Sequence, residues 1–85
     1  MNTYKLITSW GDSCVFHADI QNLRSFGEAV EEAVYIMCEM SPGRCSYAGL
    51  ASTLINGEAV KFDYHGTEEA FLKFDGENFF LNEAE

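Results

Sequence analysis

Basic side chains are scarce in this sequence: only 5 of its 85 residues are Lys or Arg, whereas 14 are Asp or Glu. The formal net charge is therefore −9. A protein that binds nucleic acid directly needs cations to replace phosphate counterions, so the charge argues against that ligand. Anionic membrane surfaces are disfavoured for the same reason. A basic protein surface is the natural complement, although acidity alone also keeps a small protein soluble.

The sequence also lacks the features of a secreted or membrane-spanning chain. Its three cysteines, Cys14, Cys38 and Cys45, form no even disulfide framework. Residues 1–11 contain no basic region followed by an apolar stretch, as a signal peptide would. No apolar run approaches the roughly 20 residues that a membrane-spanning helix needs. We therefore expect a cytoplasmic protein with reduced thiols.

No pattern typical of catalysis, metal binding or phosphate binding is present. His17 and His65 stand apart from Cys or acidic residues at metal-ligand spacing, and no Cys-x-x-Cys or His-Glu-x-x-His motif occurs. Cys38 lies next to a predicted apolar stripe, where cysteines are commonly inert. Arg44 would lower the pKa of Cys45, but this thiol has no evident base. We predict that the protein is not an enzyme and has no metal and no cofactor.

The first 21 residues show the alternation of a β-hairpin. Gly11-Asp12 suits a two-residue loop, with Gly at the first central position of a type II′ turn. The returning strand covers residues 13–20. One face of the first strand, over residues 3–10, carries Tyr4, Leu6, Thr8 and Trp10.

Residues 22–41 have the period of an amphipathic helix. Its start is signalled twice, by Asn22 as an N-cap and, one turn later, by Ser25 and Glu28 as a capping box. Pro42-Gly43 ends it. The predicted apolar stripe consists of Phe26, Ala29, Val30, Ala33, Val34, Met37 and Met40.

Residues 46–82 favour a β-meander, followed by an acidic tail over residues 83–85. Within the meander, Tyr47–Ile55 is interpreted first as a strand and alternatively as a short helix. Asn56-Gly57 and Asp75-Gly76 are candidates for type I′ hairpin turns. Thr67–Phe74 is either a strand or a short helix.

Together these elements predict one α+β domain over residues 1–85. An N-terminal hairpin, one central helix and a C-terminal meander would form an antiparallel sheet with the helix packed on one face.

The most informative surface is the polar side of the predicted helix, which carries Glu28, Glu31, Glu32 and Glu39 without a Lys or Arg between them. Glu28 and Glu32 lie about 6 Å apart along the axis, and phosphates of a DNA strand repeat every 3.4 Å or so. The row can therefore imitate nucleic acid in a basic groove, although a solvated face also fits. Further acidic candidates for partner binding are Asp63, Glu68, Glu69, Asp75 and Glu77.

The opening residues Met1-Asn2-Thr3-Tyr4, together with the small size and acidity, resemble the phage-encoded anti-CRISPR proteins. The resemblance implies a stoichiometric inhibitor acting in the bacterial cytoplasm. Its partner would be a CRISPR effector subunit, whose basic channels receive guide RNA and target DNA. No functional residue carries over from the resemblance. We expect a monomer or a weak homodimer.

A second interpretation is an antitoxin, an immunity protein or another small interaction module that binds a basic partner. It predicts a mixed apolar and acidic patch involving Trp10, Tyr4 and Tyr64, because exposed aromatic residues are typical of interface hot spots. A third interpretation is a thiol-dependent enzyme that uses Cys45 or Cys14.

Overall fold

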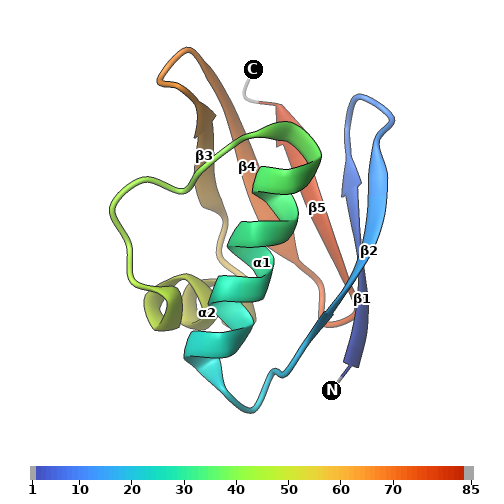
Figure 1. The fold of residues 1–85 in the computed structure, drawn as a ribbon, viewed down its shortest axis with the longest axis vertical. Helices are drawn as coiled ribbons and strands as arrows, with labels where there is room; N and C mark the ends of the chain where they lie inside the picture. Colours follow the sequence, from blue (N-terminus) through green and yellow to red (C-terminus); the bar gives the residue numbers. More distant parts are fainter. Residues whose placement is uncertain (1, 84–85) are drawn as a thin grey trace.

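A computed structural model describes residues 2–83, which form a five-stranded sheet and two helices (Figure 1). The predicted α+β class is confirmed. Residues 84–85 of the predicted acidic tail lie outside the described residues, and Glu83 belongs to the last strand. The elements are β1 (Asn2–Thr8), β2 (Ser13–Ala18), α1 (Leu23–Cys38), α2 (Tyr47–Ile55), β3 (Val60–Tyr64), β4 (Glu68–Phe74) and β5 (Asn78–Glu83).

The sheet is mixed, so the prediction of a purely antiparallel sheet is wrong. Its strand order is β2-β1-β5-β4-β3, and β1 pairs in parallel with β5 from Lys5↔Asn78 to Thr8↔Leu81. The other neighbouring pairs are antiparallel. Parallel neighbours need a long crossover connection. Here α1 and α2 lie within that connection, between the N-terminal hairpin and the three-stranded C-terminal meander.

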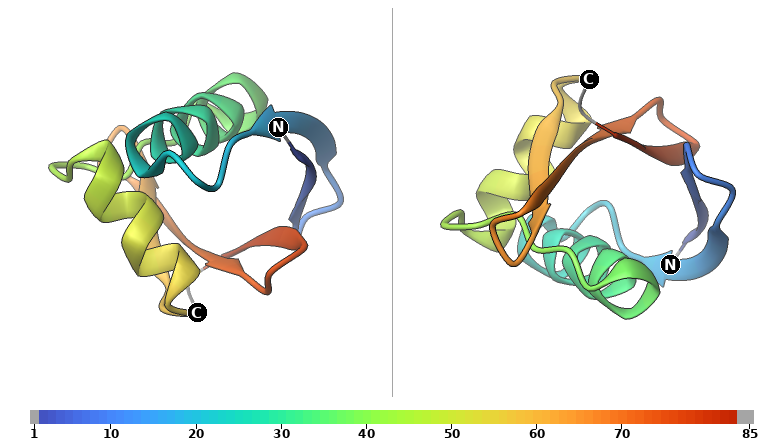
Figure 2. Two further views of the ribbon diagram at one scale, coloured as in Figure 1. Left: turned by 90° about the horizontal axis from the view of Figure 1, so that it is seen from below. Right: turned by 90° about the horizontal axis from the view of Figure 1, so that it is seen from above.

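Both helices lie on the same side of the sheet. Seen from either end, the sheet curls around the core, and α1 and α2 close its open side (Figure 2). The helix α1 contacts both α2 and β2, whereas α2 contacts β3 and β4. The prediction of a single helix is therefore wrong, but the packing of a helix across one face of the sheet is found.

The segment Tyr47–Ile55 is a helix, so its interpretation as a strand is wrong and the alternative of a short helix is confirmed. The Ser46 hydroxyl accepts a hydrogen bond of 3.0 Å from the Gly49 amide, as an N-cap does. At the other end Asn56 is the C-cap, and Gly57 has a φ of 82°.

Asn56-Gly57 thus ends a helix instead of forming a hairpin turn. The Gly57 amide donates to the Leu54 carbonyl, and the Glu58 amide donates to the Thr53 carbonyl. This pair of bonds is the Schellman arrangement, in which a residue with positive φ follows the C-cap. The meander is therefore limited to β3, β4 and β5, with Thr67–Phe74 containing the strand β4, as the first alternative predicted.

The helix α1 begins at the earlier of its two predicted N-caps. The Asn22 side chain accepts a hydrogen bond of 3.1 Å from the Ser25 amide, so the capping box of Ser25 and Glu28 is wrong. The helix ends at Cys38, three residues before the predicted residue 41. It stops there because Glu39 adopts the left-handed conformation, with a φ of 56°.

The first hairpin turns through three residues instead of two. The Gly11 amide donates to the Thr8 carbonyl, and the Thr8 amide donates to the Asp12 carbonyl. Gly11, with a φ of 99°, occupies the left-handed position that follows the turn. The predicted type II′ turn is therefore wrong, and Trp10 lies in the turn instead of in the strand β1, which ends at Thr8.

The turn between β4 and β5 depends on the Asp75 side chain. Its Oδ1 accepts hydrogen bonds of 2.8 Å from the amides of both Glu77 and Asn78. Only Gly76 has a positive φ in this loop. A type I′ turn needs two such residues, so that predicted turn type is wrong although the hairpin itself is present.

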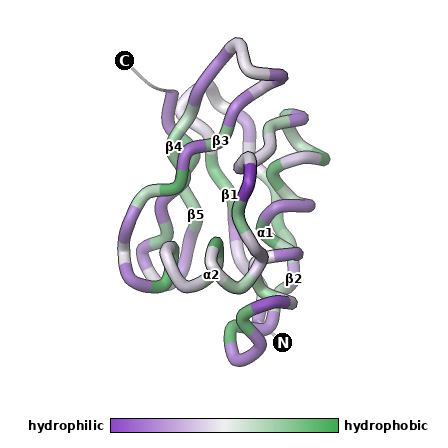
Figure 3. Tube along the Cα trace, turned by 90° about the vertical axis from the view of Figure 1, so that its left-hand side faces the viewer, coloured by the Kyte–Doolittle hydropathy of each residue, from purple (hydrophilic) through white to green (hydrophobic). Residues whose placement is uncertain are grey.

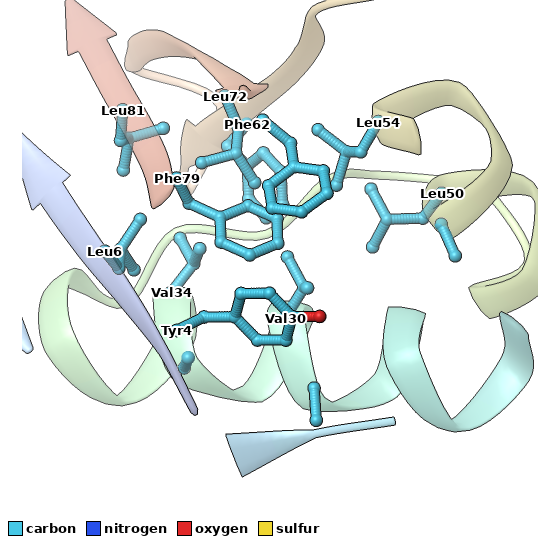
Figure 4. Close-up of a cluster of buried hydrophobic side chains, with 14 of the residues drawn as sticks. Tyr4, Leu6, Val30, Val34, Leu50, Leu54, Phe62, Leu72, Phe79 and Leu81 are labelled. Atoms are coloured by element: carbon cyan, nitrogen blue, oxygen red, sulfur yellow. The ribbon is translucent and has the colours of Figure 1, made fainter. Parts of the chain in front are cut away.

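The core centres on aromatic rings contributed by four elements. The Tyr4 ring of β1 lies 5.6 Å from each of Phe26 of α1, Phe74 of β4 and Phe79 of β5, measured between ring centroids. Aliphatic side chains from both helices and the sheet surround the rings (Figure 4). Hydrophobic and hydrophilic residues alternate along the strands (Figure 3), so one sheet face is buried and the other exposed.

The two helices meet at a glycine. A Cβ atom on Gly27 of α1 would overlap the backbone carbonyl of Tyr47, the first residue of α2. Backbone atoms cannot give way as a flexible side chain can. Gly27 therefore sets how closely α2 approaches α1.

We expect Gly27→Ala to lower the free energy of unfolding by about 1–3 kcal/mol, because the helices must separate to admit the methyl group. Helix propensity alone predicts the opposite change, since Ala is favoured over Gly by about 1 kcal/mol. Urea denaturation followed by circular dichroism measures the difference. Ser25→Ala, at an exposed position of the same helix, is the matched control and should cost nothing. A Gly27→Ala variant as stable as the wild type would contradict the close crossing.

Candidate partner-binding surface

The side of α1 that faces away from the sheet carries a continuous stripe of acidic and apolar residues. Its opposite side is buried in the core through Phe26, Val30 and Val34. The helical period therefore turns the acidic positions and their neighbours Tyr35 and Ile36 outward, and all of them are exposed except the half-buried Glu31. We call this surface the acidic stripe; it consists of Glu28, Glu31, Glu32, Tyr35, Ile36 and Glu39.

Two large apolar side chains lie in the middle of the acidic stripe. Tyr35 is 52% exposed and Ile36 is 74% exposed. Glu32 precedes them by about one turn, and Glu39 follows them by about one turn. Exposed apolar residues inside a polar rim are typical of protein interaction sites. The stripe therefore combines a charged rim with an apolar centre.

A shallow hollow adjoins the N-terminal half of the stripe. It has a volume of about 270 Å³ and lies between α1 and the start of α2. The contact at Gly27 brings Tyr47 to this position. Carboxylates form charge-assisted hydrogen bonds with Lys and Arg, and phenol rings attract cations through their faces. The hollow is lined by Glu28, Glu31, Glu32, Tyr35 and Tyr47.

The acidic stripe is not neutralised by ion pairs. Within residues 2–83, the single ion pair joins Lys61 Nζ to Glu69 Oε1 at 3.7 Å. Both of its side chains are about half exposed, so the pair contributes little to stability. No Lys or Arg nitrogen in that part of the chain lies within 4.0 Å of a carboxylate of the stripe.

A larger pocket lies where the C-terminal end of α1 meets the β1–β2 turn, the β3–β4 turn and the end of β5. Its volume is about 700 Å³. The Trp10 indole in its wall donates a hydrogen bond of 2.9 Å to Asp12 Oδ2. Glu39 of the acidic stripe directly precedes Met40 of the pocket, so the two acidic areas adjoin. We call it the end pocket; it is lined by Trp10, Met40, Thr67, Glu68, Glu69 and Glu83.

The nine acidic residues predicted as partner-binding do not form one surface. Asp63 is half-buried, and its Oδ1 accepts a hydrogen bond of 3.0 Å from the Gly66 amide. Asp75 and Glu77 lie in the β4–β5 loop, at the opposite end of β4 from Glu68 and about 20 Å away. The structure therefore groups Glu28, Glu31, Glu32 and Glu39 in the stripe and Glu68 and Glu69 in the end pocket.

The Asp75 carboxylate is occupied by the loop itself. Hydrogen bonds from the amides of Asn78 and Glu77 hold the pKa of Asp75 below its usual value. These bonds keep the loop closed, which gives Asp75 a structural role whether or not it touches a partner.

The three thiols lie in surroundings that disfavour thiolates. Burial raises the pKa of Cys14, Cys38 and Cys45, and the Glu31 carboxylate raises that of Cys45 further. The expectation that Arg44 lowers the pKa of Cys45 is therefore wrong. A protonated thiol is a poor nucleophile. Among residues 2–83, no group of three or more His, Cys, Asp or Glu side chains is placed to hold a metal ion.

Sequence reasoning missed the apolar centre of the stripe and wrongly included Tyr4 in the aromatic patch, whereas Trp10 and Tyr64 are exposed as that interpretation expects. Tyr4, predicted at an interface, is only 5% exposed because it lies in the aromatic core. The available signal was Ile36, an apolar residue on the polar side of an otherwise regular helix. Nothing in the local sequence brings Trp10 next to Glu68, because their elements meet only in the folded chain.

The pKa of Cys45 reports the negative potential beside the stripe. We expect Glu31→Gln to lower this pKa and to speed alkylation of Cys45 by iodoacetamide near neutral pH, because more thiolate is then present. Mass spectrometry of the labelled peptides measures the rate. Cys14 should keep its rate in the same sample, and Glu77→Gln should change neither rate. An unchanged Cys45 rate in Glu31→Gln would show that the carboxylate does not act on this thiol.

Neither helix in the described part of the chain has the length and apolar character needed to cross a membrane. No protein-family model, curated protein sequence or solved structure matches the chain.

Proposed function

We propose that the protein is a stoichiometric inhibitor that binds the basic surface of a nucleic-acid-binding protein through its acidic stripe. The observation that carries the proposal is the row of Glu28, Glu31 and Glu32, which has no cationic partner within 4.0 Å in residues 2–83. Its carboxylates adjoin a hollow that also offers two phenol rings. A Lys or Arg side chain of a partner would meet both kinds of group there.

The stripe supports mimicry of nucleic acid because its charges are held on a rigid element. Glu28 and Glu32 are separated by about 6 Å along the helix, and Glu39, the C-cap, follows Glu32 after roughly 10 Å. A groove that accepts phosphates at intervals of a few Å can accept carboxylates at these intervals. The end pocket, with Glu68 and Glu69, extends the acidic surface beyond the C-terminal end of α1.

The partner we propose is a CRISPR effector complex in the bacterial cytoplasm, as the resemblance to anti-CRISPR proteins implies. Such complexes hold the guide RNA and target DNA in positively charged channels. The acidic stripe would compete there with DNA for Lys and Arg. No catalytic step is part of this proposal, since occupation of the channel is sufficient.

A second candidate function is an antitoxin or immunity protein that covers a basic toxin. The observation that favours it is the exposure of Tyr35 and Ile36. A surface that only imitates phosphates has no use for them, whereas a protein interface gains most of its energy from a few buried apolar and aromatic contacts. The contribution of Ile36 therefore separates the two candidates.

The charge row is tested by two double variants with equal changes in charge. Glu28→Gln with Glu32→Gln alters the stripe, and Glu58→Gln with Glu77→Gln alters exposed positions elsewhere. The assay is inhibition of target-duplex binding by a panel of purified CRISPR effector complexes of different types. We expect the stripe variant to need at least about tenfold more protein for half-inhibition, because it loses two charge pairs.

The concentration of the control variant needed for half-inhibition should stay within about twofold of that of the wild type, because exposed charges outside the interface contribute little. Equal effects of both variants would mean that net charge alone is responsible, and the stripe would not be the site. If wild-type protein inhibits none of the complexes, the assignment to CRISPR effectors is wrong.

The apolar centre is tested by Ile36→Ala against the partner identified in that assay. For a mixed interface we expect the dissociation constant to rise about tenfold, because a central apolar contact is lost. The dependence of binding on salt should stay unchanged, since no charge is removed. Isothermal titration calorimetry at two salt concentrations measures both quantities. Wild-type affinity in Ile36→Ala would instead support pure charge mimicry.

A further inference from the structure

The outer face of the sheet differs from the acidic stripe because it carries lysines, together with the carboxylates of Glu69 and Asp63. It carries all three lysines of the chain, Lys5 on β1, Lys61 on β3 and Lys73 on β4, and all are exposed. Their strand neighbours Leu6 and Leu72 are buried, so the alternation of the strands turns the lysines away from the core. In an acidic protein, this concentration of cations on one face is distinctive.

Apolar side chains lie between these lysines. Phe80 of β5 stands opposite Lys73 of β4 and beside Ile7 of β1. Phe71, 39% exposed, is the diagonal neighbour of Phe80 across the β4–β5 pair. Ile7 and Phe80 are half-buried. We call this surface the lysine face; it consists of Lys5, Ile7, Lys61, Phe71, Lys73 and Phe80.

Two of the three lysines are available for a partner. Lys61 is paired with Glu69, but neither Lys5 nor Lys73 lies within 4.0 Å of a carboxylate oxygen in residues 2–83. The lysine face therefore presents unneutralised positive charge at two points, with Phe80 and Ile7 between them.

The acidic stripe and the lysine face match in both spacing and order. The distance between neighbouring strands and the rise per residue place the Cα atoms of Lys5 and Lys73 about 12 Å apart. Glu32 lies in α1 and Glu39 is the C-cap of this helix, so their backbones are separated by about two turns, or roughly 10 Å, and Tyr35 and Ile36 lie between them. One surface is thus acid, apolar, acid, and the other is base, apolar, base.

We infer that the lysine face binds the acidic stripe of a second copy of this chain. Tyr35 and Ile36 of one copy would pack on Ile7, Phe71 and Phe80 of the next, while carboxylates of the stripe pair with Lys5 and Lys73. This inference goes beyond the inhibitor proposal and does not depend on it, because it needs no outside partner.

The geometry makes this association head-to-tail. The stripe lies on the side of α1 that faces away from the sheet, and the lysine face is the side of the sheet away from α1 (Figure 2). The two surfaces therefore lie on opposite sides of the molecule. A contact between different surfaces leaves one of each free at the ends, so the assembly extends beyond a dimer unless it closes into a ring.

The size of the stripe makes the association weak. A helix of 16 residues is about 24 Å long and 10 Å wide. Such a footprint falls well below the roughly 800 Å² that each partner buries in a stable complex. Repulsion between acidic copies weakens it further at low salt. We therefore expect self-association only at high protein concentration.

The inference is tested with one variant for each surface. The stripe variant is Glu28→Gln, Glu32→Gln and Glu39→Gln, and the sheet variant is Lys5→Gln and Lys73→Gln. Sedimentation velocity of the wild type should show a mass above 9.5 kDa that rises with concentration up to about 1 mM. Each variant alone should remain monomeric. The stripe variant is the stricter test, because it carries three fewer negative charges than the wild type. If general repulsion between copies controlled association, this variant would associate more strongly than the wild type. If the acidic stripe is the contact, it remains monomeric.

A mixture of the two variants gives the sharpest outcome. The sheet variant keeps an intact stripe, and the stripe variant keeps an intact lysine face, so the mixture should form a 1:1 complex and nothing larger. Nuclear magnetic resonance of the labelled stripe variant, titrated with the sheet variant, should shift the amides around Lys5, Lys73 and Phe80. A monomeric wild type under all these conditions, or a mixture without a complex, would overturn the inference.

One further titration separates a second copy from another acidic occupant. A dT oligonucleotide is added to isotope-labelled wild-type protein at a low concentration, at which the protein is monomeric. If its amides around Lys5 and Phe80 then shift, the lysine face binds single-stranded nucleic acid and the assignment to a second copy is wrong.

Discussion

The packing of Tyr4 against three phenylalanine rings is the contact on which both surfaces depend. Tyr4 lies in a central strand, Phe26 lies in α1, and Phe74 and Phe79 come from the neighbouring strands β4 and β5. This contact fixes the rotation of α1 on the sheet. Once Phe26 points inward, the 3.6-residue period determines which side chains point outward. The charge row is therefore a consequence of core packing as much as of local sequence.

Elements defined by their own residues could be predicted from the sequence, and elements defined by distant contacts could not. The apolar period of α1 and the alternation in β4 are local signals, and both elements are present. The parallel pairing of β1 with β5 joins residues more than 70 positions apart, and no local pattern encodes it. Asn56-Gly57 suits either a hairpin turn or the end of a helix, because both need a positive φ. The burial of Leu50 and Leu54 against the core favours the helix.

The same division holds for the candidate site. Glu28, Glu31 and Glu32 share one helix, so their grouping followed from sequence spacing alone. The end pocket and the lysine face draw residues from three or more elements, which only the folded chain brings together. The charges are consequently distributed unevenly: the acidic stripe carries only negative charges, whereas all three lysines lie on the outer face of the sheet, where Lys61 pairs with Glu69. Self-association would cover the acidic stripe, so an inhibitor of this kind would be most available when dilute.

The parallel pairing of the first and last strands also determines how the molecule resists a pulling force. The start of β1 and the end of β5 lie at opposite ends of the sheet (Figure 1). Tension applied between these points slides the two strands past each other along their length. The pairs from Lys5↔Asn78 to Thr8↔Leu81 then carry the load together, instead of opening one after another as in a hairpin pulled apart from its open end. Unfolding by a force applied at these two points therefore requires several β1–β5 pairs to break at once, which raises the force needed even for a domain with a small core.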